Sequence, residues 1–140
     1  MTQLIPYINF ADEGREAIEF YKTVFGGEAI VTLVKDSAMA AQMPAEWGER
    51  VMNLDFRSGD IHFMGSDIIS DQIGKVPGNM MSIAVACDSV EQLHDYYDKL
   101  MAGGKEIMAP GDSGWGSIFG QCIDKFDVQW MLDSSMPADS

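Results

Sequence analysis

The stretch FADEGREAIEFYKTVFGGEAIVTLV, residues 10–34, decides the fold because it holds one helix between two strands. Asp12 is a good helix N-cap, and Gly26 with Gly27 permits the left-handed turn that ends a helix. Between them, apolar residues recur at the spacing of one buried helix face: Ala17, Ile18, Tyr21, Val24 and Phe25. We therefore predict a helix that starts after Asp12, with strands at about 4–10 and 29–34.

The same pattern returns in the second half of the chain. A strand at about 80–86 leads to a helix that Asp88 or Ser89 caps and that Gly103-Gly104 ends. The apolar positions of this helix are Val90, Leu93, Tyr97, Leu100 and Met101. Each half then closes with the order Asp, apolar, polar, aromatic, Met: DIHFM at 60–64 and DVQWM at 127–131. We interpret this as an internal duplication.

Each copy predicts a β-α-β-β-β unit. In the first copy, strands at about 50–56 and 61–66 are joined by a tight turn at 57–60, after an irregular loop at 37–49 with one short helical turn. The fold class is therefore α+β: one domain over residues 1–140, with module one at about 3–67 and module two at about 79–134.

The two modules are expected to form a curved mixed sheet around a cup. Each helix covers the convex face of its sheet, and the concave faces bury one another or a ligand. Because side chains alternate along a strand, Phe63 and Trp130 fill the helix-covered side while their neighbours line the cup.

Composition excludes several classes of protein. No apolar run approaches the length of a membrane span, and residues 1–10 do not look like a secretion signal, so we expect a soluble, cytoplasmic protein. Nine Lys and Arg against 22 Asp and Glu give a net charge of −13, which repels nucleic acid and anionic lipid. Cys87 and Cys122 lack metal-type spacing and are interpreted as reduced, buried thiols.

The chain resembles the vicinal oxygen chelate superfamily, also described as the glyoxalase/bleomycin resistance/dioxygenase fold, and in particular its PhnB-like branch. The resemblance spans nearly the whole chain. It rests on PYINF at 6–10, AIEFY at 17–21, VFGGE at 24–28, GSD at 65–67, and a C-terminal block from Trp115-Gly116 through Phe119-Gly120 to Asp124-Lys125-Phe126 and Gln129-Trp130. Branch members often carry the description of ubiquinone-pathway methyltransferases, but no Gly-rich loop joins a strand to a helix here, so we expect no methyl-donor site.

The resemblance also locates the metal ligands of metal-dependent relatives, which fall on Pro6, Met64, Ser82 and Met131. Hard divalent ions bind carboxylate, imidazole or water, and thioethers suit only soft ions. We therefore expect no metal, no cofactor and no glyoxalase reaction. The branch usually has Gly and His where this chain has Asp127 and Gln129, so we expect both a turn and an imidazole to be lost.

Two histidines are candidates for chemistry. His62 is interpreted as a general base or the remnant of a metal site, or alternatively as a rim histidine bonded to backbone or water. His94 lies on the polar side of the second helix, and we expect no function there. Asp60, Asp67, Asp124 and Asp127 bracket turns, and we expect them to bond turn backbone.

The chain is rich in methionine, with 11 residues, and thioethers adapt to irregular apolar ligands as well as filling cores. Met39, Met43, Met52, Met80 and Met81, with Met64 and Met131, fall in or beside the predicted cup. Trp47 and Trp115 lie in loops, where each is a ligand wall, an interface anchor or simple packing. The predicted ligand-binding residues are Met64, Met131, Gln129, Ser82, Trp115, Trp47, Tyr7 and Phe119.

Two functions follow. We prefer a metal-free module that binds or sequesters a small, largely apolar or aromatic molecule, as the resemblance to bleomycin-resistance proteins implies. The alternative is a metal-dependent lyase, isomerase or dioxygenase-type enzyme on a small oxygenated substrate, with other ligands or with His62 as base. Superfamily members commonly pair, so we also expect a homodimer, with no nucleic-acid or membrane partner.

Overall fold

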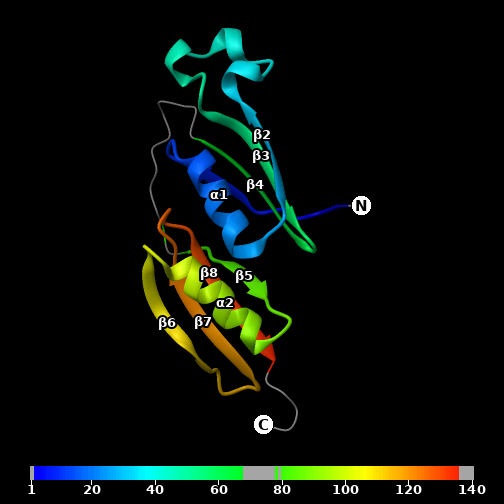
Figure 1. The fold of residues 1–140 in the computed structure, drawn as a ribbon, viewed down its shortest axis with the longest axis vertical. Coiled ribbons are helices and arrows are strands. Elements are labelled where there is room, and N and C mark those ends of the chain that lie inside the picture. Colours follow the sequence, from blue (N-terminus) through cyan, green and yellow to red (C-terminus); the bar gives the residue numbers. More distant parts are fainter. Residues whose placement is uncertain (1, 68–77, 79, 136–140) are drawn as a thin grey trace. The chain divides into compact units, whose positions relative to one another are not determined.

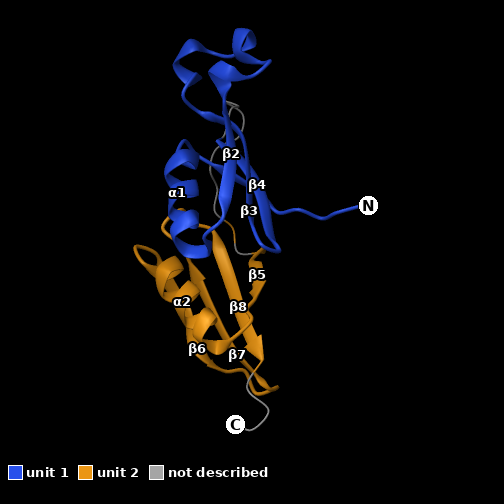
Figure 2. Cartoon of the chain, turned by 45° about the vertical axis from the view of Figure 1, so that its right-hand side comes forward, with its two compact units in different colours: residues 1–76 blue, residues 77–140 orange. Residues whose placement is uncertain are grey.

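The computed structural model describes residues 2–67, 78 and 80–135. The chain divides into two compact units, residues 1–76 and 77–140 (Figure 1, Figure 2). Each unit contains one helix on one face of a four-stranded mixed sheet, which confirms the α+β class with two modules. The single domain and the cup remain predictions.

The first unit follows the predicted order of elements. They are β1 (Tyr7–Phe10), α1 (Gly14–Phe25), β2 (Glu28–Leu33), β3 (Val51–Ser58) and β4 (Ile61–Asp67). The sheet order is β1-β4-β3-β2, with β1 parallel to β4 and the other neighbours antiparallel. Between β2 and β3 lie three short 3₁₀ turns, where we predicted one: Val34–Asp36, Ala40–Gln42 and Ala45–Trp47.

The second unit repeats this arrangement. Its elements are β5 (Ile83–Ala86), α2 (Val90–Met101), β6 (Lys105–Asp112), β7 (Ser117–Ile123) and β8 (Gln129–Ser135). The order β5-β8-β7-β6 is that of the first sheet, and β5 is parallel to β8. The strand predicted at 80–86 is shorter, since Met80 and Met81 precede it and are exposed. The connector at 68–77 lies outside the described residues.

The core of each unit lies between its helix and its sheet. Phe56 and Phe63 stack with their ring centroids 4.8 Å apart, and Tyr21 of α1 meets Phe63 edge-on at 5.5 Å. Trp130 lies on the equivalent side of the second sheet and is 1% exposed. The prediction that Phe63 and Trp130 fill the helix-covered side is therefore confirmed.

The two helices begin in different ways. The prediction that Asp12 caps α1 was wrong: Glu13 is at the cap position and makes no side-chain cap bond. Instead Asp67, at the end of β4, accepts hydrogen bonds from the backbone nitrogens of Gly14 at 2.7 Å and Val51 at 2.8 Å. Burial raises the pKa of Asp67, against the two backbone bonds that lower it. This carboxylate thus ties together α1, β3 and β4 and is not a turn residue.

In the second unit the helix is capped locally. Ser89 accepts from the backbone nitrogen of Gln92 at 3.0 Å, and the Gln92 side chain accepts from the Asp88 nitrogen at 2.7 Å. This reciprocal arrangement is a variant of the capping box. Of the two predicted caps, Ser89 is the one used.

Each helix is followed by a pair of glycines that is required sterically. Gly26, Gly27 and Gly103 have φ values of 73°, 80° and 77°. A Cβ on Gly27 would overlap the carbonyl oxygen of Arg57, and one on Gly104 would overlap that of Ile123. Both units therefore need a residue without a side chain where the helix turns back to the sheet.

Aspartates organise the turn before β8. Asp124 is buried and accepts from the backbone nitrogens of Phe126 and Val128 and from Nε1 of Trp130, at 2.8, 3.1 and 2.8 Å. This confirms turn bonding for Asp124. Asp127 has a φ of 71°, the left-handed region that glycine adopts most easily, so the expectation of a lost turn was wrong.

Two expectations drawn from the composition concern the cysteine thiols and membrane-spanning helices. Both cysteines are free thiols, with Cys122 buried and Cys87 half-buried. Burial raises the pKa of Cys87 to about 11 and that of Cys122 to about 12, so neither forms a reactive thiolate near neutral pH. Among the described residues no helix has the length and apolar character to cross a membrane.

Candidate functional site

Each sheet has one face that its own helix does not cover. On the first sheet, the register aligns Tyr7 with Met64 and Met64 with Asp55, and it aligns His62 with Arg57. These five residues lie on the face opposite Phe63, because neighbours along a strand alternate. We call this set the first open face; it brings together the predicted residues Tyr7, His62 and Met64.

An ionic cluster of Asp55, Arg57 and His62 occupies this face. The Oδ1 atom of Asp55 lies 3.1 Å from Nε of Arg57 and 3.1 Å from Nε2 of His62. Chiefly the hydrogen bond from Arg57, with its charge and that of His62, holds the pKa of Asp55 below its usual value, against the effect of burial. One ring nitrogen of His62, Nε2, therefore contacts a carboxylate.

Tyr7 and Pro6 lie at and just before the start of β1, beside Met64 of β4. Tyr7 is 49% exposed, and its hydroxyl donates a long hydrogen bond of 3.5 Å to Oδ1 of Asn53. The carbonyl oxygen of Pro6 accepts from the Met64 nitrogen at 2.9 Å. Two of the four positions aligned with metal ligands are thus side by side in the first unit.

On the second sheet, the corresponding second open face consists of Phe119, Gln121, Ile123, Gln129 and Met131. Gln121 is aligned with Met131, and Ile123 with Gln129. Ser82, just before β5, donates a 3.4 Å hydrogen bond to Gln129, whose amide donates to the carbonyl of Gly78. The predicted residues Ser82, Phe119, Gln129 and Met131 are therefore grouped in this unit.

The two loop tryptophans lie outside both open faces. Trp47 is half-buried in a 3₁₀ turn, and the Arg50 guanidinium lies 4.7 Å from its ring centroid. Trp115 is 76% exposed in the connection between β6 and β7. Neither tryptophan lies in a strand, so the strand register does not align either one with the other predicted residues of its unit. His94 is exposed on α2.

The donor atoms at the aligned metal positions do not fit a hard divalent ion. The first unit offers Met64 beside Pro6, and the second offers Met131, aligned with Ala84, and Ser82, which bonds Gln129. Over residues 2–67, 78 and 80–135, no three His, Cys, Asp or Glu side chains are grouped so that they could hold a metal ion. Thioether, hydroxyl and proline carbonyl groups are poor substitutes for carboxylate and imidazole ligands.

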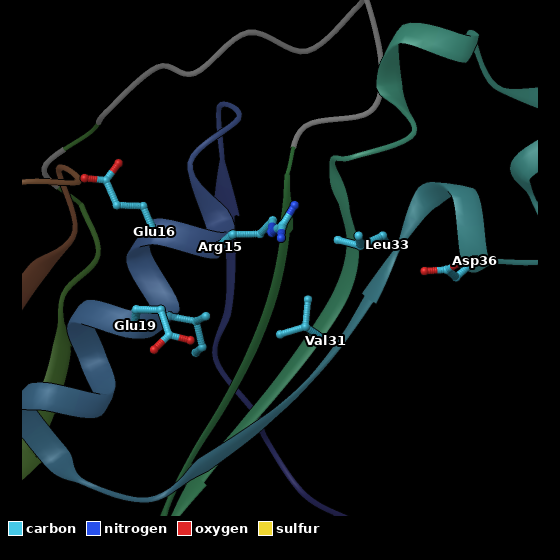
Figure 3. A pocket seen from close by; sticks show the side chains of 7 residues that line it. Arg15, Glu16, Glu19, Val31, Leu33 and Asp36 are labelled. Atoms are coloured by element: carbon cyan, nitrogen blue, oxygen red, sulfur yellow. The ribbon is translucent and has the colours of Figure 1, made fainter.

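A groove of about 570 Å³ lies elsewhere, between α1 and β2 (Figure 3). Val31 and Leu33 of β2 form part of it, and the exposed carboxylates of Glu16, Glu19 and Asp36 surround it. Val31 is aligned with the buried Leu54 and so faces the helix-covered side of the sheet. None of the predicted ligand-binding residues lines this groove. We place a candidate site on each open face, where most of the predicted residues of that unit lie together, and not in this groove.

Sequence reasoning missed Asp55 and Arg57. The signal was present, since Asn53, Asp55 and Arg57 alternate with the apolar Leu54 and Phe56 in β3. Such a period of two marks a strand with one polar face. The alternation predicts the face, but only the pairing with β4 places Asp55 beside His62.

Comparison with known proteins gives consistent results. Residues 2–132 match the family model described as 3-demethylubiquinone-9 3-methyltransferase. Protein YjdN of Escherichia coli strain K12 is 30% identical over 137 residues, which cover 93% of each chain. Protein PA1353 from Pseudomonas aeruginosa is 27% identical, with a TM-score of 0.87 over 98% of this chain and 100% of that one.

A more distant structure supports the fold alone. The bleomycin resistance determinant encoded on the transposon Tn5 is 14% identical, with a TM-score of 0.58 over 98% of this chain and all of that one. The strand order of the two sheets and these similarities agree. The chain belongs to the family described as 3-demethylubiquinone-9 3-methyltransferase, a PhnB-like group within the vicinal oxygen chelate superfamily.

Proposed function

We propose that this protein is a metal-free module that binds or sequesters a small, largely apolar or aromatic molecule on its open sheet faces. The observation that carries the proposal is the donor set at the aligned metal positions. Pro6 with Met64, and Ser82 with Met131, present thioether and weak oxygen donors in place of imidazole and carboxylate.

The side chains of the open faces support an apolar or aromatic ligand. Tyr7 and Met64 on the first face, and Phe119, Ile123 and Met131 on the second, are all partly exposed. Thioethers and aromatic rings contact such ligands favourably, and a few polar groups among them fix orientation. Trp47 in the first unit and Trp115 in the second are each proposed as a wall beside the open face of its own unit. The Tn5 relative, by its name a bleomycin resistance determinant, is consistent with sequestration.

Methyl transfer is not part of the proposal, although the family description names it. The two connections from a strand to a helix, residues 11–13 and 87–89, contain no glycine. Close approach of backbone to a nucleotide-like methyl donor favours glycine in such a connection.

Metal analysis and native mass spectrometry of protein taken directly from cells test the proposal together. We expect no stoichiometric metal and a retained small organic molecule. A tightly held Zn, Fe, Mn or Ni at one equivalent, resistant to dialysis, would contradict the metal-free function and favour the metal-dependent enzyme. Mutation of Met64 and Met131 to Ala should release the retained molecule, whereas Met39→Ala in the 3₁₀ segment should not.

We also propose a cytoplasmic homodimer. Ile30 on the edge strand β2 is 75% exposed, and Ile107 and Met108 on the edge strand β6 are 49% and 53% exposed. Apolar edge strands favour pairing with a second copy. Light scattering at micromolar concentration should give twice the 15.4 kDa chain mass, and a monomer would exclude the dimer.

A further inference from the structure

We propose that the ligand is a weak oxygen acid such as a phenol or an enol, that His62 accepts its proton, and that Arg57 binds the resulting oxyanion. Asp55 is the positioning residue for His62. This inference rests on the proposed ligand-binding function of the first open face and adds the chemical class of the ligand.

The geometry of the ionic cluster fixes which imidazole nitrogen is free. An ionised carboxylate only accepts hydrogen bonds, so Nε2 of His62 is the donor in its 3.1 Å contact with Asp55. In a neutral imidazole the other nitrogen, Nδ1, is then an acceptor. Within the part of the chain that the structure describes, Nδ1 has no hydrogen-bond donor. With respect to the described residues, the imidazole thus presents one acceptor without a donor.

Arg57 supplies the complementary group. Only its Nε atom bonds Asp55, at 3.1 Å, which leaves its terminal N–H groups for another acceptor among the described residues. The side chains of His62 and Asp55 are 19% and 24% exposed, whereas that of Arg57 is 66% exposed. A ligand on this face can therefore reach a sheltered imidazole and a water-facing guanidinium, which converge on one carboxylate oxygen.

Charge explains why the ligand arrives as a neutral acid. A net charge of −13 repels a preformed anion but not an uncharged phenol. On the face, the O–H proton moves to Nδ1 and the bonding pair stays on the ligand oxygen. The imidazolium then lies beside the Asp55 carboxylate, and the oxyanion lies beside the Arg57 guanidinium.

Other charged or titratable groups face the cluster from the neighbouring strands. Glu28 on β2 is aligned with Arg57, and Tyr7 on β1 is aligned with Met64. Glu28 belongs to an exposed strand end, where water screens its charge. The second open face carries Gln121, Ile123 and Gln129 at the positions equivalent to Asp55, Arg57 and His62, so these three positions hold no imidazole and no charge. The titratable groups on this face are Asp133, aligned with Phe119, and Lys105, aligned with Ile123.

Two probes of matched shape separate this inference from the proposed function. Para-nitrophenol has an ionisable hydroxyl whose phenolate absorbs visible light, and para-nitroanisole carries a methyl ether in its place. Both are titrated with full-length protein at a pH where most free nitrophenol is neutral. We expect both to bind, and we expect only nitrophenol to gain a phenolate band.

Variants assign the effect to the cluster. His62→Gln should abolish the phenolate band and weaken nitrophenol binding about tenfold, as expected for one charge-assisted hydrogen bond, with nitroanisole binding unchanged. His94→Gln, at an exposed position of α2 in the second unit, should change nothing. Arg57→Gln should weaken the band, since the oxyanion loses its charged donor.

The role of Asp55 needs a readout that a structural role would not change. Long-range proton–nitrogen NMR of the two histidines should show the His62 proton on Nε2, and Asp55→Asn should convert the ring to a mixture of tautomers. If both probes bind and no phenolate band appears, the inference is wrong and the proposed function stands. If neither probe binds, both are wrong.

Discussion

The two units share one strand order and one helix position, yet equivalent positions on their open faces carry different side chains. The helix-covered sides match: Phe63 and Trp130 are both buried, and both strands carry Met one residue later. On the open sides, Asp55, Arg57 and His62 stand where the second unit has Gln121, Ile123 and Gln129. The two repeats thus share the buried residues on the helix-covered face of the sheet and differ in the side chains on the open face.

The helices differ in a second way that affects stability. The N-terminus of α1 is bonded by Asp67 from 53 residues along the chain, whereas α2 is bonded by Ser89 next to it. A distant cap couples helix formation to the sheet, while a local cap stabilises the helix by itself. Stability measurements on matched variants can test each difference between the units.

The largest expected effect is that of Asp67→Ala. The change leaves the backbone nitrogens of Gly14 and Val51 buried without acceptors, so the free energy of unfolding should fall by about 3 kcal/mol. Ser134, at the equivalent position of β8, makes a single bond among the described residues, of 3.5 Å to Ser135. Ser134→Ala is therefore the matched control and should cost about 1 kcal/mol or less. Urea denaturation measures both, and equal losses would contradict the proposed role of Asp67.

A smaller loss is expected from Ser89→Ala in the second unit. It removes a cap bond of 3.0 Å to the Gln92 nitrogen, which typically costs about 1 kcal/mol. Asp12→Ala in the first unit is the control, because Asp12 does not cap α1 and the change should be nearly neutral. A loss for Asp12→Ala as large as that for Ser89→Ala would restore the local cap that the sequence predicts.

The charge of the first open face should appear in the pH dependence of stability. The folded-state pKa of Asp55 is lowered from 3.8, so its contribution is present above that value and is lost as the pH falls through the folded pKa. Asp55→Asn should therefore be less stable than the wild type at about pH 7, by about 1 kcal/mol or less because Arg57 is exposed, and equal to it at about pH 2. Gln121→Asn in the second unit should show a difference that does not vary with pH.

The smallest effect is a gain of stability from Asp127→Gly. Asp127 holds a φ of 71°, which an L-residue adopts at a cost that glycine avoids. We expect the midpoint of thermal unfolding to rise by an amount equivalent to about 0.5 kcal/mol. Lys125→Gly in the same turn is the control and should not stabilise, because Lys125 has no positive φ. A fall for Asp127→Gly would mean that the side chain contributes more than the backbone costs.

The sequence predicted the periodic parts of the fold well. The buried faces of both helices were visible as apolar spacing, and the alternation in DIHFM and DVQWM placed Phe63 and Trp130 correctly. Both signals are local, because they depend on which neighbours share a face within one element. The helix ends at Gly26 and Gly103 were equally local and equally clear.

Long-range hydrogen bonds were not predictable in the same way. Asp12 had the correct residue type and spacing for a cap, but Asp67 occupied that role from another strand. Similarly, the polar alternation of β3 did not reveal that Asp55 meets His62, since this depends on the register with β4. A hydrogen bond from a residue distant in sequence can replace a local N-cap, and the residues next to the helix do not reveal it.

The glycines that follow the helices limit how this chain can evolve. At Gly27 and Gly104 any side chain would strike a strand carbonyl, so every substitution there is costly whatever its polarity. The open faces carry no such restriction, and a mutation on them alters chemistry without disturbing the core. Substitutions that suit a new ligand can therefore accumulate on the open face of each repeat, while the glycine turn between helix and sheet tolerates no side chain in either repeat.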